Sequence, residues 1–171
     1  EAIGKTGTMI DLGAGNCAKA AALFPLIEPA RYVAVDVSVD FVRDALRRLQ
    51  REHPRVEMAG LGIDFADALE LPAELLHGRP LFFYPGSSIG NFTPADAQAF
   101  LRRVHRHAKG GCLLIGVDLV KAKPVLEAAY DDAVGVTAAF NLNVLRHLNR
   151  VIGSDFDLRQ WQHVALFDEA A

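Results

Sequence analysis

Two short stretches of this 171-residue chain combine glycine with polar side chains in patterns that suit ligand binding. The first, DLGAGNCA at residues 11–18, satisfies the pattern G-x-G-x-x-G/A through Gly13, Gly15 and Ala18. Glycine suits such a turn because a side chain would block a ligand's approach. Asp36 ends the next apolar run about 20 residues later, as expected for a ribose-binding acid. A nucleotide-like cofactor is the favoured interpretation, and a purely structural tight turn is the alternative.

The glycine pattern by itself does not name the cofactor. A dinucleotide places its pyrophosphate on a helix N-terminus, whereas S-adenosylmethionine carries a sulfonium cation and an amino-acid tail. Asp11, just before the glycines, would favour a cation, and Asp64 in GIDFAD is placed to accept a hydrogen bond from an adenine amino group. Lys19 is either a partner for the tail carboxylate or a solvated lysine, and Asp64 is alternatively a helix cap. S-adenosylmethionine is therefore favoured over a dinucleotide.

The second stretch, PGSSIGN at residues 85–91, lies between an apolar run and a predicted helix. Gly86 and Gly90 allow the backbone to approach a ligand closely, and Asn91 offers both a donor and an acceptor to a substrate amine or carboxylate. The alternative for Asn91 is an Asx-turn that simply precedes the helix. A loop of this composition predicts substrate binding beside the cofactor.

Short apolar runs alternate with helical patterns along the chain. The runs are rich in β-branched and aromatic residues without polar alternation, which is typical of strands covered on both faces of a parallel sheet. We therefore predict one α/β domain over residues 1–171, a doubly wound, mostly parallel sheet with right-handed crossovers. The predicted strands are 8–12, 31–37, 56–63, 80–84, 112–120 and 161–168, and the predicted helical segments are 17–27, 39–53, 66–76, 94–108, 123–134 and 137–153.

Composition excludes several classes of partner. A net charge of −3 gives no basic footprint for nucleic acid or an anionic membrane surface, and no apolar run reaches membrane-spanning length. Two cysteines do not make a disulfide framework, so a cytoplasmic protein is expected. His105 and His107 are two residues apart on a predicted helix and share no face, so no metal site is expected. The chain starts without methionine, which indicates a partial chain.

Six motifs together resemble the histidine N-α-methyltransferase family of ergothioneine biosynthesis. They run over essentially the whole chain: DLGAGN, VAVDVS, GIDFAD, YPGSSIGNFTPADAQAFL, GVDLVK and AAYDDAVGVTAAFNLNVLRHLNR. The resemblance implies a Rossmann-like class I methyltransferase core that uses S-adenosylmethionine to trimethylate the α-amine of L-histidine, giving hercynine. The first loop departs from the family, which has a GSGTS-like sequence where this chain has GAGNC.

Carried over by motif, the cofactor residues agree with those singled out above. Gly13 and Lys19 match the family's cofactor loop, Asp36 its ribose acid, and Asp64 with Phe65 its adenine contacts. The resemblance thus implies S-adenosylmethionine as the cofactor.

The resemblance also implies substrate-binding residues. Gly86 and Asn91 match positions that line the amino-acid substrate, with Asn91 at its α-amino-acid end, and Tyr130 matches a tyrosine that holds the substrate carboxylate. Phe140 is expected to line the same cavity. Asn91 and Tyr130 are the expected catalytic pair, because holding the amine at near-attack distance is the main requirement of methyl transfer. For Tyr130 the alternative is a helix tyrosine with its hydroxyl at the surface.

Rival functions stay open at this point. The family's N-terminal tyrosines and its C-terminal imidazole-reading residues are expected to lie outside these 171 residues. The acceptor could therefore be another amino acid or a tryptophan derivative, or the piece could be a non-catalytic adenosine-binding core. An NAD-dependent oxidoreductase is disfavoured because no Tyr-x-x-x-Lys pair occurs. A monomer is favoured for the oligomeric state.

Overall fold

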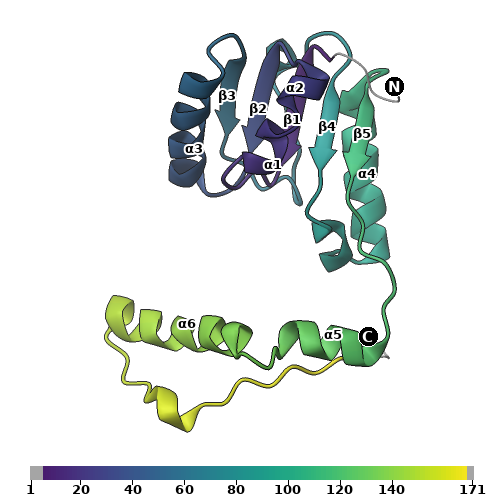
Figure 1. Cartoon of the computed structure of the whole chain (residues 1–171). Coiled ribbons are helices and arrows are strands. Elements are labelled where there is room, and N and C mark those ends of the chain that lie inside the picture. Colours follow the sequence, from purple (N-terminus) through teal and green to yellow (C-terminus); the bar gives the residue numbers. More distant parts are fainter. Residues whose placement is uncertain (1–5, 169–171) are drawn as a thin grey trace. The chain divides into compact units, whose positions relative to one another are not determined.

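The computed structural model describes residues 6–168 and divides the chain into two compact units, Glu1–Asp118 and Leu119–Ala171. The first unit holds a parallel sheet in the order β3-β2-β1-β4-β5 (Figure 1). Its strands are β1 (Thr8–Leu12), β2 (Arg31–Val35), β3 (Glu57–Leu61), β4 (Leu81–Tyr84) and β5 (Cys112–Ile115). The predicted doubly wound fold is confirmed for this unit, and the single domain over 1–171 stays a prediction.

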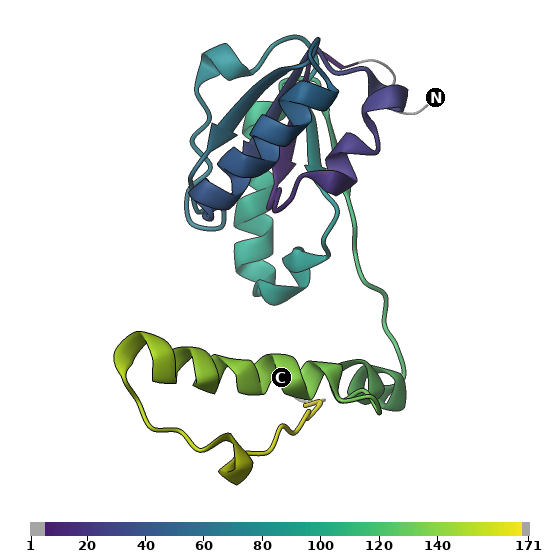
Figure 2. The ribbon, with the colours of Figure 1, turned by 60° about the vertical axis from the view of Figure 1, so that its left-hand side comes forward.

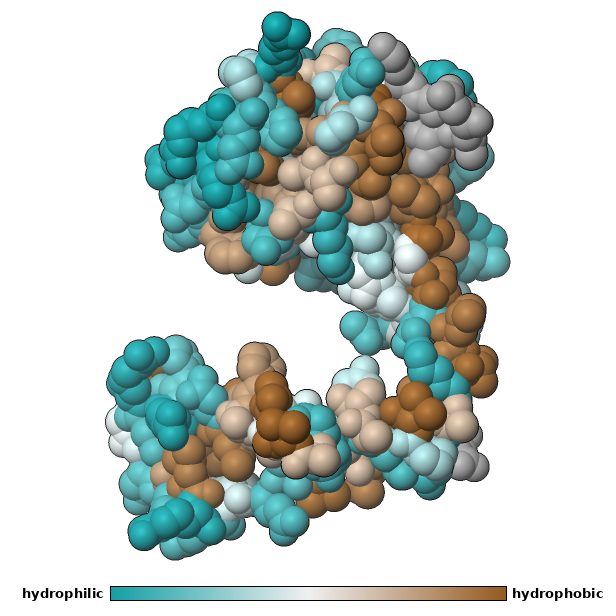
Figure 3. All heavy atoms as spheres, in the orientation of Figure 1, coloured by the Kyte–Doolittle hydropathy of each residue, from teal (hydrophilic) through white to brown (hydrophobic). Residues whose placement is uncertain are grey.

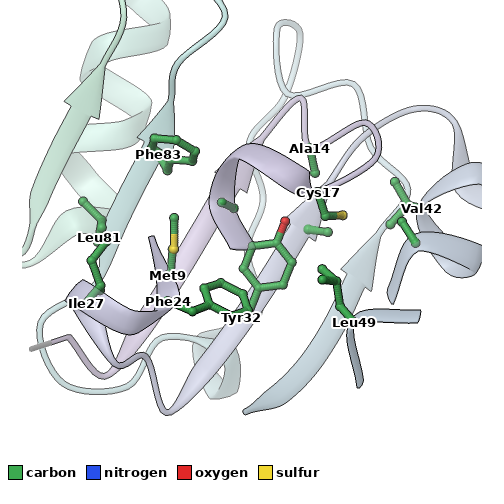
Figure 4. Close-up of a cluster of buried hydrophobic side chains, with 13 residues drawn as sticks. Met9, Ala14, Cys17, Phe24, Ile27, Tyr32, Val42, Leu49, Leu81 and Phe83 are labelled. Atoms are coloured by element: carbon green, nitrogen blue, oxygen red, sulfur yellow. The ribbon is translucent and has the colours of Figure 1, made fainter. Parts of the chain in front are cut away.

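Helices cover both faces of the sheet (Figures 1 and 2). On one face lie α1 (Ala18–Ala21), α2 (Phe24–Ile27) and α3 (Val39–Glu52), and on the other lies α4 (Pro94–Ala108). Successive strand residues point to opposite faces, so Met9 and Tyr32 join the cluster under α1 to α3 (Figure 4), whereas Ile10 and Val33 join the cluster under α4. Because both faces are covered, the strands read as continuous apolar runs.

The two long helices of this unit follow from local sequence signals. In α3 the buried residues Val42, Ala45 and Leu49 recur at helical spacing. In α4 the hydroxyl oxygen of Thr93 accepts a hydrogen bond from the backbone N–H of Asp96 at 3.2 Å, and Pro94 occupies the first turn. Thr93 is therefore the N-cap of α4.

Residues 66–76, predicted to be helical, form only a turn and the short 3₁₀ helix η1 (Ala73–Leu75). Leu69 and Leu71 are both buried in the cluster under α4, and residues two apart share one side of an extended chain, not of a helix. Pro72 also disfavours helical backbone at the residue before it. Residues 66–76 therefore cover the sheet as a largely extended segment instead of a helix.

The predicted helix over 17–27 is split into α1 and α2. Pro25 has no N–H to donate to a carbonyl one turn earlier, so a continuous helix would lose a hydrogen bond there. The strands are also shorter than predicted at their carboxyl ends: β2 ends at Val35 rather than 37, and β5 ends at Ile115 rather than 120. Beyond these ends the backbone leaves the ladder and forms the loops of the site.

The second unit is built from α5 (Lys123–Tyr130), α6 (Val136–Ile152) and the 3₁₀ helix η3 (Leu158–Gln160). Asp132 caps α6, because its carboxylate accepts backbone N–H bonds from Val136 at 2.9 Å and Thr137 at 2.8 Å. These bonds hold the pKa of Asp132 down at about 2. Hydrophobic side chains remain on the surface of this unit (Figure 3), among them Phe140 and Val144 of α6.

The predicted strand over 161–168 is wrong for this structure, in which these residues are irregular. A lone extended segment gains no ladder hydrogen bonds, and among the described residues no strand lies beside it. Side-chain contacts hold the segment instead. His163 Nε2 donates to the backbone carbonyl of Tyr130 at 2.7 Å, and the Trp161 ring packs edge-on against Phe156 at 5.7 Å.

We expect Phe100→Ala to lower the free energy of unfolding by about 3–5 kcal/mol. Phe100 is fully buried, and its ring packs against the rings of Phe65, Tyr84 and Phe92. The neighbouring Leu101→Ala is the matched control, because Leu101 is 38% exposed and its truncation is expected to cost less than about 1 kcal/mol. Urea unfolding of both variants measures the difference, and equal losses would contradict the assigned core.

Candidate functional site

The site lies at the carboxyl ends of β1 and β4, the point where the strand order reverses. These neighbouring strands pair in parallel, with Asp11 beside Phe83, so the loops that follow them emerge side by side. Between the loops is a cavity of about 220 Å³. Open α/β sheets bind ligands at this switch point. The cavity is lined by Asp11, Leu12, Gly13, Ala14, Gly15, Asn16, Lys19, Phe65, Tyr84, Pro85, Gly86 and Ser88.

The glycine loop has the backbone that its sequence predicts. Gly13 and Gly15 adopt φ values of +74° and +52°, a region that side chains other than glycine rarely enter. The N–H groups of Gly13 and Ala14 both donate to the carbonyl of Val35, at 2.9 and 3.2 Å. The loop is therefore anchored on the end of β2 and held open above the cavity.

Asp36 fastens the glycine loop from the other side. One carboxylate oxygen accepts the Gly15 N–H at 3.0 Å, and the other accepts the Ser38 N–H at 2.9 Å. Each carboxylate oxygen has a second lone-pair direction. Asp36 can therefore organise the loop and accept hydroxyl hydrogen bonds from a ligand at the same time, although it does not line the cavity itself.

Asp11 forms the floor of the cavity and is only 3% exposed. Its carboxylate accepts a hydrogen bond from the hydroxyl of Tyr32 at 2.7 Å. Burial raises the pKa of Asp11 to about 6; the Tyr32 hydrogen bond opposes that rise, Asp36 adds to it, and Lys19 lowers it. A cation bound in the cavity would therefore be attracted strongly by the ionised carboxyl group, because little water screens it.

Phe65 and Asp64 follow β3 and differ in their relation to the cavity. The ring of Phe65 lines it, and a Cβ built on Gly13 would lie 3.7 Å from this ring. Asp64 is exposed, is not among the lining residues, and accepts the Ala66 N–H at 3.0 Å. That bond closes a turn rather than starting the predicted helix, so the alternative role of Asp64 as a helix cap is not found.

The loop after β4 brings Gly86 to the cavity and places Asn91 at the end of the 3₁₀ helix η2 (Ser88–Asn91). Asn91 is exposed and does not line the cavity. Ser87 has φ +58°, and its hydroxyl accepts the Asp118 N–H at 2.7 Å. This bond ties the loop to the segment after β5.

Tyr130 and Phe140 belong to the second unit, where both are exposed, by 66% and 74%. Tyr130 lines a separate cavity of about 510 Å³ together with Glu127, His163 and residues 164–167. Its backbone carbonyl is held by His163. The roles of Tyr130 and Phe140 in binding a substrate stay predictions.

Sequence reasoning missed three side chains of the first unit. Tyr84 and Ser88 both line the cavity. A tyrosine as the last residue of a buried strand was a usable signal, since its hydroxyl needs a partner. Tyr32 was also missed, although strand alternation places it on the same face as Asp11.

Within residues 6–168 no group of three or more His, Cys, Asp or Glu side chains is arranged to hold a metal ion. His107 instead contacts the carbonyl of Leu69 through Nε2 at 2.7 Å. Among the same residues no helix is long and apolar enough to cross a membrane.

The fold is that of the class I methyltransferases. Mycolic acid cyclopropane synthase CmaA1, solved in complex with SAH and CTAB, matches with a TM-score of 0.51 and 14% identity, covering 88% of this chain and 48% of that one. The sequence profile described as "Histidine-specific methyltransferase, SAM-dependent" matches residues 1–171. The chain belongs to this family, which confirms the resemblance drawn from its motifs.

Two relatives place the chain within the family. It is 40% identical over 164 residues to histidine N-α-methyltransferase of Mycolicibacterium smegmatis, a match that covers 92% of this chain and 50% of the relative. The protein of the same name from Mycobacterium tuberculosis is 38% identical over 172 residues, with 97% of this chain and 53% of the relative covered. The chain thus spans about half the length of the curated relatives it matches.

We expect Asp11→Asn to abolish a pH dependence of stability. Below the ordinary carboxyl pKa of 3.8 both the folded and the unfolded chain hold the Asp11 proton. Between about 4 and 6 only the folded chain holds it, so the free energy of unfolding falls as pH rises through this window, by roughly 3 kcal/mol in total. Urea unfolding at pH 4, 5, 6 and 7 should therefore show that the free energy of unfolding of the variant rises relative to that of the wild type as pH rises.

The control for this titration is Asp40→Asn, because the Asp40 side chain is 91% exposed. Its stability curve should run parallel to that of the wild type. A parallel curve for Asp11→Asn as well would show that Asp11 does not titrate as a buried group.

Proposed function

We propose that the protein containing this chain transfers methyl groups from S-adenosylmethionine to the α-amine of L-histidine and yields hercynine, a step of ergothioneine biosynthesis. The observation that carries this proposal is the match of the histidine-specific family over residues 1–171. The identity of about 40% to a histidine N-α-methyltransferase supports histidine as the acceptor. The substrate is then a small molecule. We further propose a cytoplasmic monomer, and the two free cysteines agree with a reducing compartment.

The charge in the cavity supports S-adenosylmethionine over a dinucleotide. A buried carboxylate at the floor, Asp11, would repel a pyrophosphate and attract a sulfonium or ammonium group. The cavity of about 220 Å³ is smaller than the roughly 300–1,000 Å³ of a pocket that encloses a whole drug-sized ligand. In our proposal it takes the methionine end, with Lys19 at the tail carboxylate, while Asp36, Asp64 and Phe65 serve the ribose and the adenine.

The remaining residues receive the substrate in this proposal. Gly86 lies at the cavity wall and allows the amino acid to come close to the backbone. Asn91 holds the α-amino-acid end, Tyr130 holds the carboxylate, and Phe140 lines the same cavity. Asn91 and Tyr130 are the pair that would fix the orientation of the amine.

The chemistry asks for placement rather than for a strong acid. When bound, S-adenosylmethionine supplies a methyl group on a positively charged sulfur. The amine lone pair forms a bond to the methyl carbon as the carbon–sulfur bond breaks, and the sulfur leaves as a neutral thioether. Positive charge moves from sulfur to nitrogen, so the protein has to hold the amine at near-attack distance and keep water out. Asn91 would contribute through its two hydrogen-bonding groups, and Asp11 would offset the cationic charge on the donor side.

Incubation of the full-length protein with S-adenosylmethionine and L-histidine tests the proposal. Mass spectrometry should show products with one, two and three added methyl groups. Methylation of L-tryptophan or another amino acid in place of L-histidine would favour a different acceptor. For the 171-residue chain alone, calorimetry that detects S-adenosylhomocysteine but no L-histidine would indicate a cofactor-binding core without an assembled substrate pocket.

We expect Asn91→Ala in the full-length protein to lower turnover by about 100-fold or more, since misplacement of a reacting group by about 1 Å has effects of that size. Asn91 is exposed, so its truncation should leave the melting temperature nearly unchanged. Gln98→Ala, on the exposed surface of α4, is the matched amide control and should retain full activity. Full activity of Asn91→Ala would remove Asn91 from the site.

A further inference from the structure

The first unit buries one charged side chain among the described residues, and that side chain is Asp11. Taking a carboxylate out of water costs free energy unless it is paired or hydrogen-bonded. An apolar residue at the end of β1 would avoid this cost, as Leu12 does on the opposite face. The arrangement that keeps Asp11 ionisable therefore needs an explanation beyond packing.

The hydrogen bond to Asp11 comes from Tyr32, in the interior of β2. Tyr32 pairs with Met9 in the ladder, and Asp11 lies two residues further along β1 on the same face. The ring of Tyr32 is fully buried and packs edge-on against Phe24 at 5.2 Å (Figure 4). Its position therefore places the hydroxyl, at the end of a ring buried in the core, beneath the floor of the cavity.

We propose that Tyr32 is a positioning residue of the methyl-donor site: its hydroxyl holds Asp11 as a carboxylate aimed at the cationic end of the donor and thereby sets the pH below which the donor stops binding. This inference rests on the proposed function, because it takes the cavity ligand to be S-adenosylmethionine. Tyr32 is placed to act through Asp11, from beneath it, since it does not line the cavity.

The physical reason is that a hydrogen bond donated to the charged form of an acid favours that form. The pKa of Asp11 is about 6 with this bond in place. A hydrogen bond to a charged group is among the stronger hydrogen bonds of a protein, so its loss moves the pKa of the acid toward the neutral form. Without the Tyr32 hydroxyl the Asp11 pKa should rise by about one unit or more, into the neutral range.

Several other titratable or charged groups lie near Asp11 and Tyr32 and influence the electrostatics of the site. From the loop after β2, Asp36 raises the Asp11 pKa, and from α1, Lys19 lowers it. Burial raises the pKa of the Cys17 thiol, while Tyr32 and the positive charge of Arg48 in α3 lower it. Tyr84, at the end of β4, lines the same cavity, and burial raises the pKa of its hydroxyl. Among these groups only Tyr32 is hydrogen-bonded to Asp11.

The test is calorimetric titration of the chain with S-adenosylmethionine between pH 5.5 and 8.5, for the wild type and for Tyr32→Phe. Wild-type affinity should fall below about pH 6. For Tyr32→Phe the midpoint of that fall should move up by about one pH unit, so that binding is about fivefold weaker than wild type at pH 6. At pH 8.5, where Asp11 is ionised in both proteins, the two affinities should be similar.

Two further variants separate this role from a packing role. Phe24→Leu disturbs the ring against Tyr32 but leaves the hydroxyl, so it should lower the melting temperature without moving the pH midpoint. Asp11→Asn should bind weakly with little change over the range. S-Adenosylhomocysteine keeps the ammonium group but lacks the sulfonium, so it identifies the cation that Asp11 attracts. If the pH midpoint of binding shifts with both ligands, the cation is the ammonium. If it shifts with S-adenosylmethionine alone, the cation is the sulfonium.

The outcomes are distinct. A wild-type chain that binds neither ligand at any pH would contradict the proposed cofactor itself. A wild type that binds, with Tyr32→Phe showing the same pH midpoint, would overturn the inference and leave the proposed function intact. Should Tyr32→Phe fail to fold, the wild-type hydroxyl proton of Tyr32 gives an independent measurement by NMR. It should shift with the Asp11 titration, and a constant shift from pH 4.5 to 8 would equally overturn the inference.

Discussion

The pairing of β1 between β2 and β4 is the constraint on which the rest of the first unit depends. Because all three strands are parallel, their carboxyl ends meet at one edge, and their connections depart in opposite directions from β1. The glycine loop completes this arrangement by donating two N–H groups to the last carbonyl of β2. A ligand cavity thus results from topology and backbone hydrogen bonds before any particular side chain is chosen.

Side-chain chemistry then distinguishes this site from other cavities of the same fold. The strands place apolar residues on both faces, and Asp11 interrupts that pattern near the end of β1, where the strand reaches the cavity. The free-energy cost of burying this carboxyl group is lowered by the hydrogen bond that the buried Tyr32 hydroxyl donates to it. Local stability is therefore lower than an apolar substitute would allow, which is typical of functional positions.

Apolar runs and local signals predicted most of the first unit. The strand cores, α3 and α4 follow from patterns that local physics enforces. Residues 66–76 and 161–168 could not be predicted in this way, because extended packing of Leu69 and Leu71 overrides helix propensity and a strand needs a partner. At the site, Gly13, Gly15 and Asp11 were found from their spacing, but Tyr32 was hidden among core residues.

One remaining feature concerns how the isolated chain behaves in solution. β5 ends the sheet, with a strand neighbour on one side only among the described residues, and its four residues, Cys112 to Ile115, carry no charge. Backbone groups along such a border are a template for strands of other molecules, and the usual protection is a lysine, a proline or a bulge. Among these devices the sequence of β5 shows neither a lysine nor a proline, and the strand is short. An exposed strand edge of this kind favours association between molecules at high concentration.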